Sequence, residues 1–132
     1  MTEQPNLTAL GVLVGGADPD RLVEWYRAAL EPLGARWDEH MLVVGEGAGT
    51  GVIGFDGRDD VADTTREPGR QMICLTVRDV RAAEAHLDSL GVRWIRRPEE
   101  MAPGVWFSTV EDPDGNYLQF IQAPAAGAAD AD

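Results

Sequence analysis

Apolar residues recur along the chain with two different spacings, one typical of helices and one typical of strands. Around residues 22–33 and 80–90 they return every three to four positions, which predicts two amphipathic helices. Asp79 is the predicted N-cap of the second helix, whereas Asp18 and Asp20 are both candidate caps for the first.

Short runs of β-branched, aromatic and alternating apolar residues surround both helices and predict strands. The predicted strands are residues 9–14, 35–38, 41–44 and 51–55 in the first half, and 72–77, 92–96, 105–110 and 117–121 in the second. The last two are joined by DPDGN at residues 112–116. This segment predicts a tight hairpin turn, because proline presets φ and glycine accepts a positive φ.

The two halves are also similar in sequence. Residues 21–37 align with residues 78–94 at an offset of 57, and eight of the 17 aligned positions are identical, including Trp37 with Trp94. This self-similarity indicates a duplicated unit. The equivalent positions of the two tryptophans favour a structural role that both share.

The fold class predicted from these elements is α+β, with two tandem βαβββ units in a single domain over residues 1–122. Unit one covers about residues 7–56 and unit two about residues 71–122. The polar, acidic segment 57–70 is the predicted linker. Residues 123–132 are of low complexity and form a predicted disordered tail.

Charge and composition narrow the classes of partner. The chain has 132 residues, with 11 Lys and Arg against 23 Asp and Glu, which gives a formal net charge of −12. Nucleic-acid-binding proteins need a basic patch, so we expect no nucleic-acid partner. The short apolar runs and the polar first residues predict no membrane segment and a cytoplasmic location.

The duplicated units and the segment EDPDGNYLQFIQ (residues 111–122) together resemble the glyoxalase/bleomycin-resistance/extradiol-dioxygenase family, also called the vicinal oxygen chelate family. The resemblance covers about residues 7–122. It implies that each unit curls its mixed sheet into a half-barrel cup with helices outside. It also implies a homodimer with ligand sites shared between chains, often with exchange of a strand or arm.

Enzymes of this family typically hold a divalent metal through His, Gln or Glu side chains from the first and last strands of each unit. The matching positions of this sequence are Met72, Gln119, Ala9 or Gly11, and residues 52–54. Gln119 is the only one of these with a ligand of the expected kind, and a single neutral donor does not hold a metal against water. The resemblance therefore implies no metal ligands and no cofactor.

Other catalytic arrangements are weakly supported. Cys74 is the only cysteine, which excludes an internal disulfide and a CxxC motif, and no base is apparent beside it.

Glu39 and His40 are adjacent, so in a strand they point to opposite faces and do not share one ion. We therefore expect His40 to lie in a solvated turn or to make a contact at the rim of the cup. The glycine-rich residues 45–51 precede a strand and lack Lys, which favours a hairpin loop over a phosphate site.

Alternation in the strands separates a uniformly apolar face, expected to pack on the helices, from a mixed face, expected to line the cup. Trp106 and Phe107 alternate, and the resemblance assigns Phe107 to the inside. The predicted ligand-binding residues are Trp37, His40, Phe55, Met72, Cys74, Thr76, Phe107, Thr109, Tyr117 and Gln119.

An apolar cup with a few polar anchors is typical of a site for a mid-sized organic molecule. Within the family, the branch without metal ligands implies metal-independent binding and sequestration of an aromatic, antibiotic-like natural product. Cys74 and Thr76 depart from the larger aromatic residues that the bleomycin-binding type can carry, which puts bleomycin itself in doubt. The alternatives are an enzyme of the same fold (a lyase, isomerase or dioxygenase) with unconventional ligands, or a structural or regulatory module whose cup is filled by its own side chains.

Overall fold

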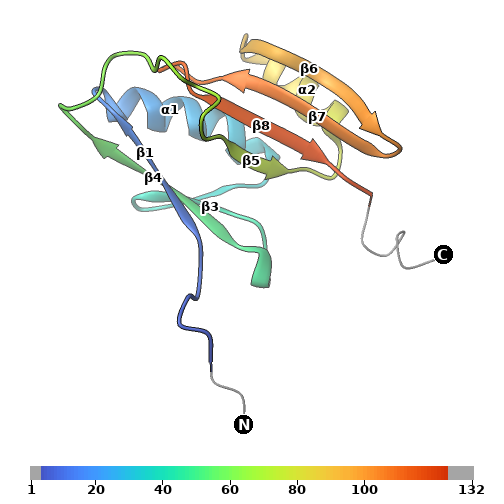
Figure 1. Ribbon diagram of the computed structural model, residues 1–132, viewed down its shortest axis with the longest axis horizontal. Helices are drawn as coiled ribbons and strands as arrows, with labels where there is room; N and C mark the ends of the chain where they lie inside the picture. Colours follow the sequence, from blue (N-terminus) through green and yellow to red (C-terminus); the bar gives the residue numbers. More distant parts are fainter. Residues whose placement is uncertain (1–3, 125–132) are drawn as a thin grey trace.

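The computed structural model describes residues 4–124, which contain two α-helices, two short 3-10 helices and eight strands (Figure 1). Most of the predicted disordered tail, residues 125–132, lies outside the described part of the chain. In chain order the elements are β1 (Gly11–Gly16), α1 (Pro19–Leu30), η1 (Glu31–Leu33), β2 (Arg36–Asp38), β3 (Met41–Val44), η2 (Gly47–Gly49), β4 (Gly51–Gly57), β5 (Ile73–Thr76), α2 (Val80–Ser89), β6 (Arg93–Ala102), β7 (Val105–Glu111) and β8 (Tyr117–Gln122). Neither α-helix of this described part is both long and apolar enough to span a membrane.

The strands form two four-stranded mixed sheets, one in each unit. Their orders are β1-β4-β3-β2 and β5-β8-β7-β6. In both sheets the first strand of the unit pairs in parallel with the last, and the remaining pairs are antiparallel. The structure thus confirms the tandem βαβββ organisation.

Both helices begin and end where the local sequence supplies capping groups. The Asp18 carboxylate accepts the Arg21 N–H at 3.2 Å, so Asp18 rather than Asp20 caps α1. The Asp79 carboxylate accepts the Ala82 N–H at 3.1 Å at the start of α2. These side chains satisfy backbone N–H groups that have no partner within the helix.

The two units share one hydrophobic core, although they are built as separate sheets. Leu22 and Tyr26 of α1 lie in the same buried cluster as Leu87 of α2. Both sheets contribute one face to this cluster. Its remaining members are Val14, Ala29, Leu30, Leu42, Ile53, Val110, Leu118 and Phe120. The opposite face of each sheet is therefore left outside the core.

Strand β6 differs most from the sequence prediction. It was expected over residues 92–96 but extends from Arg93 to Ala102, paired with β7 through several register shifts. Pro98 and the charged residues of this stretch are typical of a loop in sequence. On an exposed edge strand the same residues are favourable, since they discourage pairing with other chains.

Candidate functional site

Seven of the predicted ligand-binding residues share the face of the unit-two sheet that points away from the core. The register places Cys74 opposite Gln119, and Gln119 opposite Thr109. Their sequence neighbours Leu118 and Phe120 are buried in the core, so the strand period directs Gln119 the other way. We call this surface the unit-two face; its predicted members are Met72, Cys74, Thr76, Phe107, Thr109, Tyr117 and Gln119.

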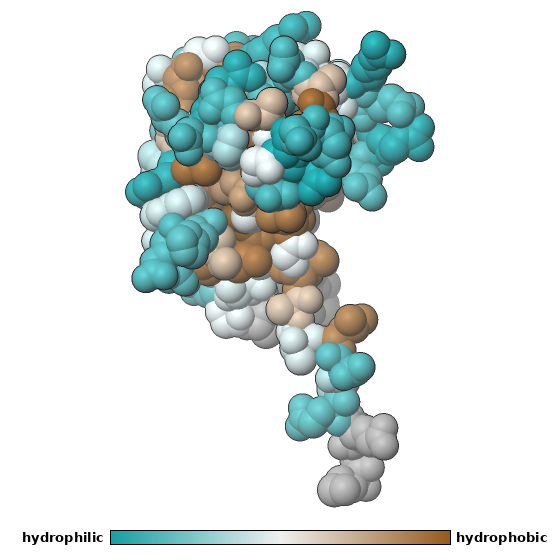
Figure 2. Space-filling view, turned by 90° about the vertical axis from the view of Figure 1, so that its left-hand side faces the viewer, coloured by the Kyte–Doolittle hydropathy of each residue, from teal (hydrophilic) through white to brown (hydrophobic). Residues whose placement is uncertain are grey.

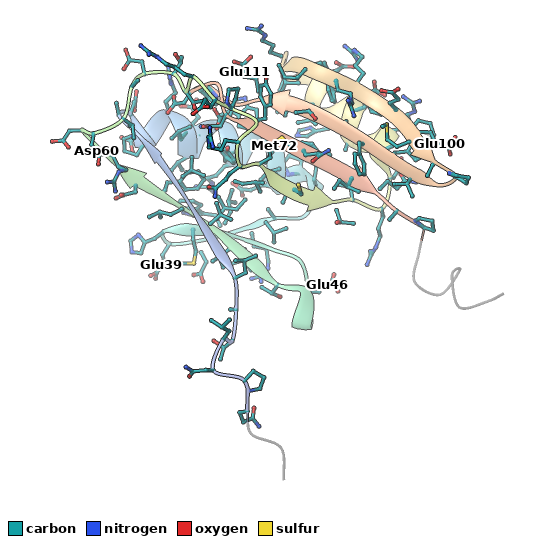
Figure 3. All side chains as sticks on the ribbon, viewed as in Figure 1. Glu39, Glu46, Asp60, Met72, Glu100 and Glu111 are labelled. Carbon is teal, nitrogen blue, oxygen red and sulfur yellow. The ribbon has the colours of Figure 1, made fainter. Side chains whose placement is uncertain are left out.

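A polar contact lies across the two central strands of this face. The Cys74 Sγ is 3.3 Å from the Gln119 Oε1, so the thiol donates to the carboxamide oxygen. The carboxamide N–H groups of Gln119 are then available as donors to a ligand. Cys74 is solvent-exposed, and Met72 beside the start of β5 is 39% exposed (Figure 3). The centre of the face is accessible.

The two aromatic residues at the start of β7, Trp106 and Phe107, point to opposite sides of the sheet. The Arg81 guanidinium of helix α2 lies over the Trp106 ring, 4.9 Å from its centroid, which places Trp106 on the helix side of β7. Phe107 therefore points to the unit-two face, where the register sets it opposite Ile121. It supplies an aromatic ring beside the polar centre.

Two predicted site residues lie on the wrong side of the unit-one sheet for this role. The Phe55 ring centroid is 5.3 Å from that of Tyr26 and 6.4 Å from that of Trp37. The prediction that Phe55 and Trp37 line the binding face is therefore corrected: both pack against the core. The Arg27 guanidinium lies over the Trp37 ring and the Arg97 guanidinium over the Trp94 ring, so the two equivalent tryptophans make the same kind of contact.

His40 is exposed in the two-residue turn between β2 and β3. Its backbone N–H donates to the Asp38 carbonyl, and the preceding Glu39 has a positive φ of 54°. The imidazole therefore belongs to a solvated turn at the outer edge of unit one. The structure does not bring it to the unit-two face.

The corresponding open face of unit one is apolar around Gly11 and Gly54, whereas the Arg58 side chain lies over Gly15. A Cβ at Gly54 would lie 3.1 Å from the Leu13 Cδ1, and one at Gly11 would lie 2.8 Å from the Val52 Cγ2. Leu13 and Val52 thus lie over bare backbone, and Leu13 is 65% exposed. Seen from the left of Figure 1, an apolar band crosses the middle of the surface (Figure 2).

Sequence reasoning missed Glu111, which also points to the unit-two face. The register sets it opposite Tyr117, and its Oε2 is 3.0 Å from the Arg93 Nε. This oxygen is buried without a well-directed hydrogen bond among the described residues. The sequence could have predicted this orientation of Glu111. It follows Phe107 and Thr109 at a spacing of two, so in a strand all three side chains point to the same face.

The DPDGN turn fastens unit two to helix α1. The Tyr26 hydroxyl donates to the Asp112 Oδ2 at 2.7 Å in a buried contact, and the Arg21 guanidinium donates to the Asp114 Oδ1 at 2.6 Å. Burial, together with the Asp112 charge, raises the pKa of Tyr26 far above its usual value. The phenol therefore stays a neutral donor. This turn has a structural function between the units.

The residues of the open faces do not fit a divalent metal. In the part of the chain that the structure describes, no group of three His, Cys, Asp or Glu side chains is placed to hold one. Gly11, at one of the positions that match a family ligand, has no side chain, and the Val52 side chain occupies the space that a ligating side chain would need there. Met72 offers a thioether, which suits soft rather than hard cations. No reaction step is therefore assigned to a metal at these faces.

Several solved structures have a fold similar to that of this chain. The chain is similar to the crystal structure of TioX from Micromonospora sp. ML1, with 17% identity, a TM-score of 0.62, and coverage of 86% of this chain and 97% of the other. It is also similar to a glyoxalase/bleomycin resistance protein from Albidiferax ferrireducens T118, with 20% identity, a TM-score of 0.60, and coverage of 86% of this chain and 97% of the other. A third similar structure is lactoylglutathione lyase from Agrobacterium tumefaciens, with 14% identity, a TM-score of 0.58, and coverage of 91% of this chain and 96% of the other. At these identities the likeness shows the fold alone.

No curated protein sequence matches the chain. The family model "Glyoxalase/Bleomycin resistance protein/Dioxygenase superfamily" matches residues 10–120, which include both βαβββ units. The chain belongs to the glyoxalase/bleomycin resistance protein/dioxygenase superfamily.

Proposed function

We propose that this protein binds and sequesters a mid-sized aromatic natural product of the antibiotic type, without a metal, at the unit-two face. The observation that carries the proposal is the composition of that face. Phe107 and Met72 offer apolar contact, whereas Cys74 and Gln119 offer polar anchors; Thr109 beside them is buried. Such a mixture is typical of sites for organic ligands.

The chemistry of the face favours binding over turnover. The Cys74 thiol contacts the Gln119 carboxamide, which does not act as a base. The carboxylate of Glu111 is paired with the Arg93 guanidinium. These contacts leave the described face with hydrogen-bonding groups and an aromatic ring, which suit recognition of a planar molecule.

We further propose a homodimer in which a second copy completes each site. Leu10 and Leu13, at the start of the unit-one sheet, are 78% and 65% exposed, and β1 is the edge of that sheet. The unit-two face is likewise open to solvent at Cys74 and Thr76. A ligand pocket buries most of its ligand, so one open face needs a second wall. The apolar part of the unit-one face of another copy, around Leu13, would supply such a wall.

The cytoplasm is the proposed location, because a single free cysteine at the binding face is suited to a reducing compartment.

The function is tested by isothermal titration of the purified protein with bleomycin, an anthracycline and chloramphenicol, followed by mass analysis of each compound. The expected result is one bound molecule per chain for at least one of the aromatic compounds, recovered unchanged. Chemical conversion of the bound compound would replace sequestration by an enzymatic function. Absence of binding to every compound would contradict the proposed ligand class.

The shared site is tested by light scattering and titration of the variant Leu13→Asp, with Val61→Asp as a matched control in the linker. Both side chains are exposed in the single chain. We expect Leu13→Asp to yield monomers that have lost ligand binding, because a charge is buried at the proposed interface. Monomers that bind as tightly as the unaltered protein would contradict a shared site.

A further inference from the structure

A cleft of about 730 Å³ lies on the helix side of the molecule, away from the unit-two face. It is bounded by the end of α1 and the turn after β3 on one side, and by β5 and the start of α2 on the other (Figure 1). Thr76 is the one predicted site residue among those lining it. Thr76 thus lies at the boundary of the two features, and the other residues of the unit-two face do not line the cleft.

The walls of this cleft are apolar and come from both units. Leu33 and Val44 line it from unit one, and Leu75, Val77 and Phe120 from unit two. The first four are only partly buried although they pack against the core. These side chains thus present apolar surface to an opening whose size falls in the range of organic-ligand pockets. Filling the cleft would remove this surface from water.

The mouth of the cleft carries three charged residues, Glu46, Arg78 and Asp79 (Glu46 is labelled in Figure 3). Neither Glu46 nor Arg78 makes a salt bridge to another described residue. The Asp79 carboxylate is occupied as the cap of α2. Glu46, on the opposite wall, is the carboxylate left for a ligand.

Charge decides which class of molecule fits this mouth. The charged residues lining it are two carboxylates and one guanidinium, and the whole chain has a net charge of −12. A protein with this field attracts cations and repels anions. A positively charged group beside Glu46 would form an ion pair at the mouth, while its apolar body lay against the walls.

We propose that the cleft is a second binding site, which takes a mid-sized organic cation with an apolar body. The cationic group lies beside Glu46, and the body contacts Leu75, Val77 and Phe120. The proposal does not depend on the function assigned to the unit-two face. The two sites lie on opposite sides of β5, because Leu75 faces the cleft and Cys74 faces the open side.

Berberine, a planar cation whose fluorescence rises in apolar surroundings, is the probe that tests this site. The variant Ala82→Leu places a larger side chain in the cleft, since Ala82 lines it. Ala85→Leu is the matched control: it is an exposed alanine of the same helix that does not line the cleft. Circular dichroism melts of both variants show whether each is folded.

The expected result is saturable berberine binding that Ala82→Leu weakens about tenfold or more, whereas Ala85→Leu leaves it unchanged. Glu46→Gln should weaken binding severalfold and reduce its dependence on salt, because it removes the ion pair. The anionic dye 8-anilinonaphthalene-1-sulfonate should bind far more weakly to the unaltered protein.

Two outcomes would overturn the proposal. One is the absence of berberine binding to the unaltered protein. The other is binding that Ala82→Leu does not weaken. If Phe107→Ala abolished berberine binding and Ala82→Leu did not, the probe would be bound at the unit-two face. That result would overturn the cleft site while supporting the function proposed for the face.

Discussion

The carboxylate of Asp112 is the single group on which the junction of the two units most depends. It accepts the Tyr26 hydroxyl and the backbone N–H groups of Asp114 and Asn116, as well as the Asn116 side-chain amide. The residue is almost fully buried. Such a buried carboxylate is stable only where its oxygens are fully hydrogen-bonded.

Tyr26→Phe is expected to lower the free energy of unfolding by about 1–3 kcal/mol, because it removes a hydrogen bond to a buried charged acceptor. Urea denaturation measures the change. Tyr117→Phe is the matched control, since the Tyr117 hydroxyl has no hydrogen bond to another described side chain. Equal losses in the two variants would show that the Tyr26–Asp112 contact is not stabilising.

Phe107→Ala is expected to weaken binding of the ligand found by titration by about 1–3 kcal/mol, as loss of an aromatic anchor does at other binding surfaces. The dissociation constant from calorimetry checks this. Trp106→Phe, on the helix side of the same strand, should leave it unchanged. An unaltered constant in Phe107→Ala would remove this ring from the site.

At the scale of the elements, the two sides of β5 and β8 could be predicted from the sequence. Both strands alternate between uniformly apolar and mixed residues, so Cys74 and Gln119 separate from Leu118 and Phe120 without any other information. The strand period is rigid, which is why the sequence shows which of these residues share one side of the sheet. Met72, Cys74, Thr76, Tyr117 and Gln119 lie on this face for this reason, whereas Phe107 of β7 was assigned to it from the family resemblance.

The failures also have physical causes. In β4, Gly54 and Phe55 are neighbours, and a glycine supplies no side chain to show which face is covered. Phe55 was therefore assigned to the wrong side. The Tyr26–Asp112 contact joins residues 86 apart, for which local sequence carries no signal. The cleft depends on how two units pack, which no single element determines.

Helix α2 and strand β6 are joined by charged contacts at Asp88. The Arg97 guanidinium and the Trp94 indole N–H donate to its carboxylate at 3.1 and 2.9 Å. These two hydrogen bonds lower the pKa of Asp88 because they stabilise its charged form. The bond from Arg97 has the larger effect, and the bond from Trp94 the next largest. The stability from these contacts is present above the ordinary Asp pKa and is lost as pH falls through the lowered value.

Arg97→Gln is therefore expected to raise the pKa of Asp88 toward its ordinary value. Carboxyl chemical shifts followed by NMR between pH 2 and 6 measure this midpoint. Arg96→Gln is the control, because Arg96 lies near Glu99 rather than Asp88. The same midpoint in Arg97→Gln and in the unaltered protein would show that the ion pair does not form in solution.

At the scale of the whole molecule, the two duplicated units have one core. Residues of both sheets and both helices lie in a single buried cluster, and Tyr26 of this cluster also donates a hydrogen bond to Asp112 of unit two. A unit removed from the other would expose part of this cluster. The duplicated halves are thus expected to unfold as one.

This expectation is tested with 5-fluorotryptophan, because each unit carries two of the four tryptophans, Trp25 and Trp37 in unit one and Trp94 and Trp106 in unit two. The four native ¹⁹F resonances should lose intensity at the same urea concentration, as in a two-state transition. Loss of the unit-one resonances while those of unit two persist would contradict a shared core.

The pairing of the first strand of each unit with its last also affects synthesis of the protein. Strand β5 leaves the ribosome before α2, β6 and β7, yet its hydrogen-bonded neighbour in the sheet is β8. The nascent chain therefore carries an unpaired strand while residues 77–116 are translated. A chain that ends within that interval keeps β5 without its partner strand, and an unpaired strand edge is prone to aggregation.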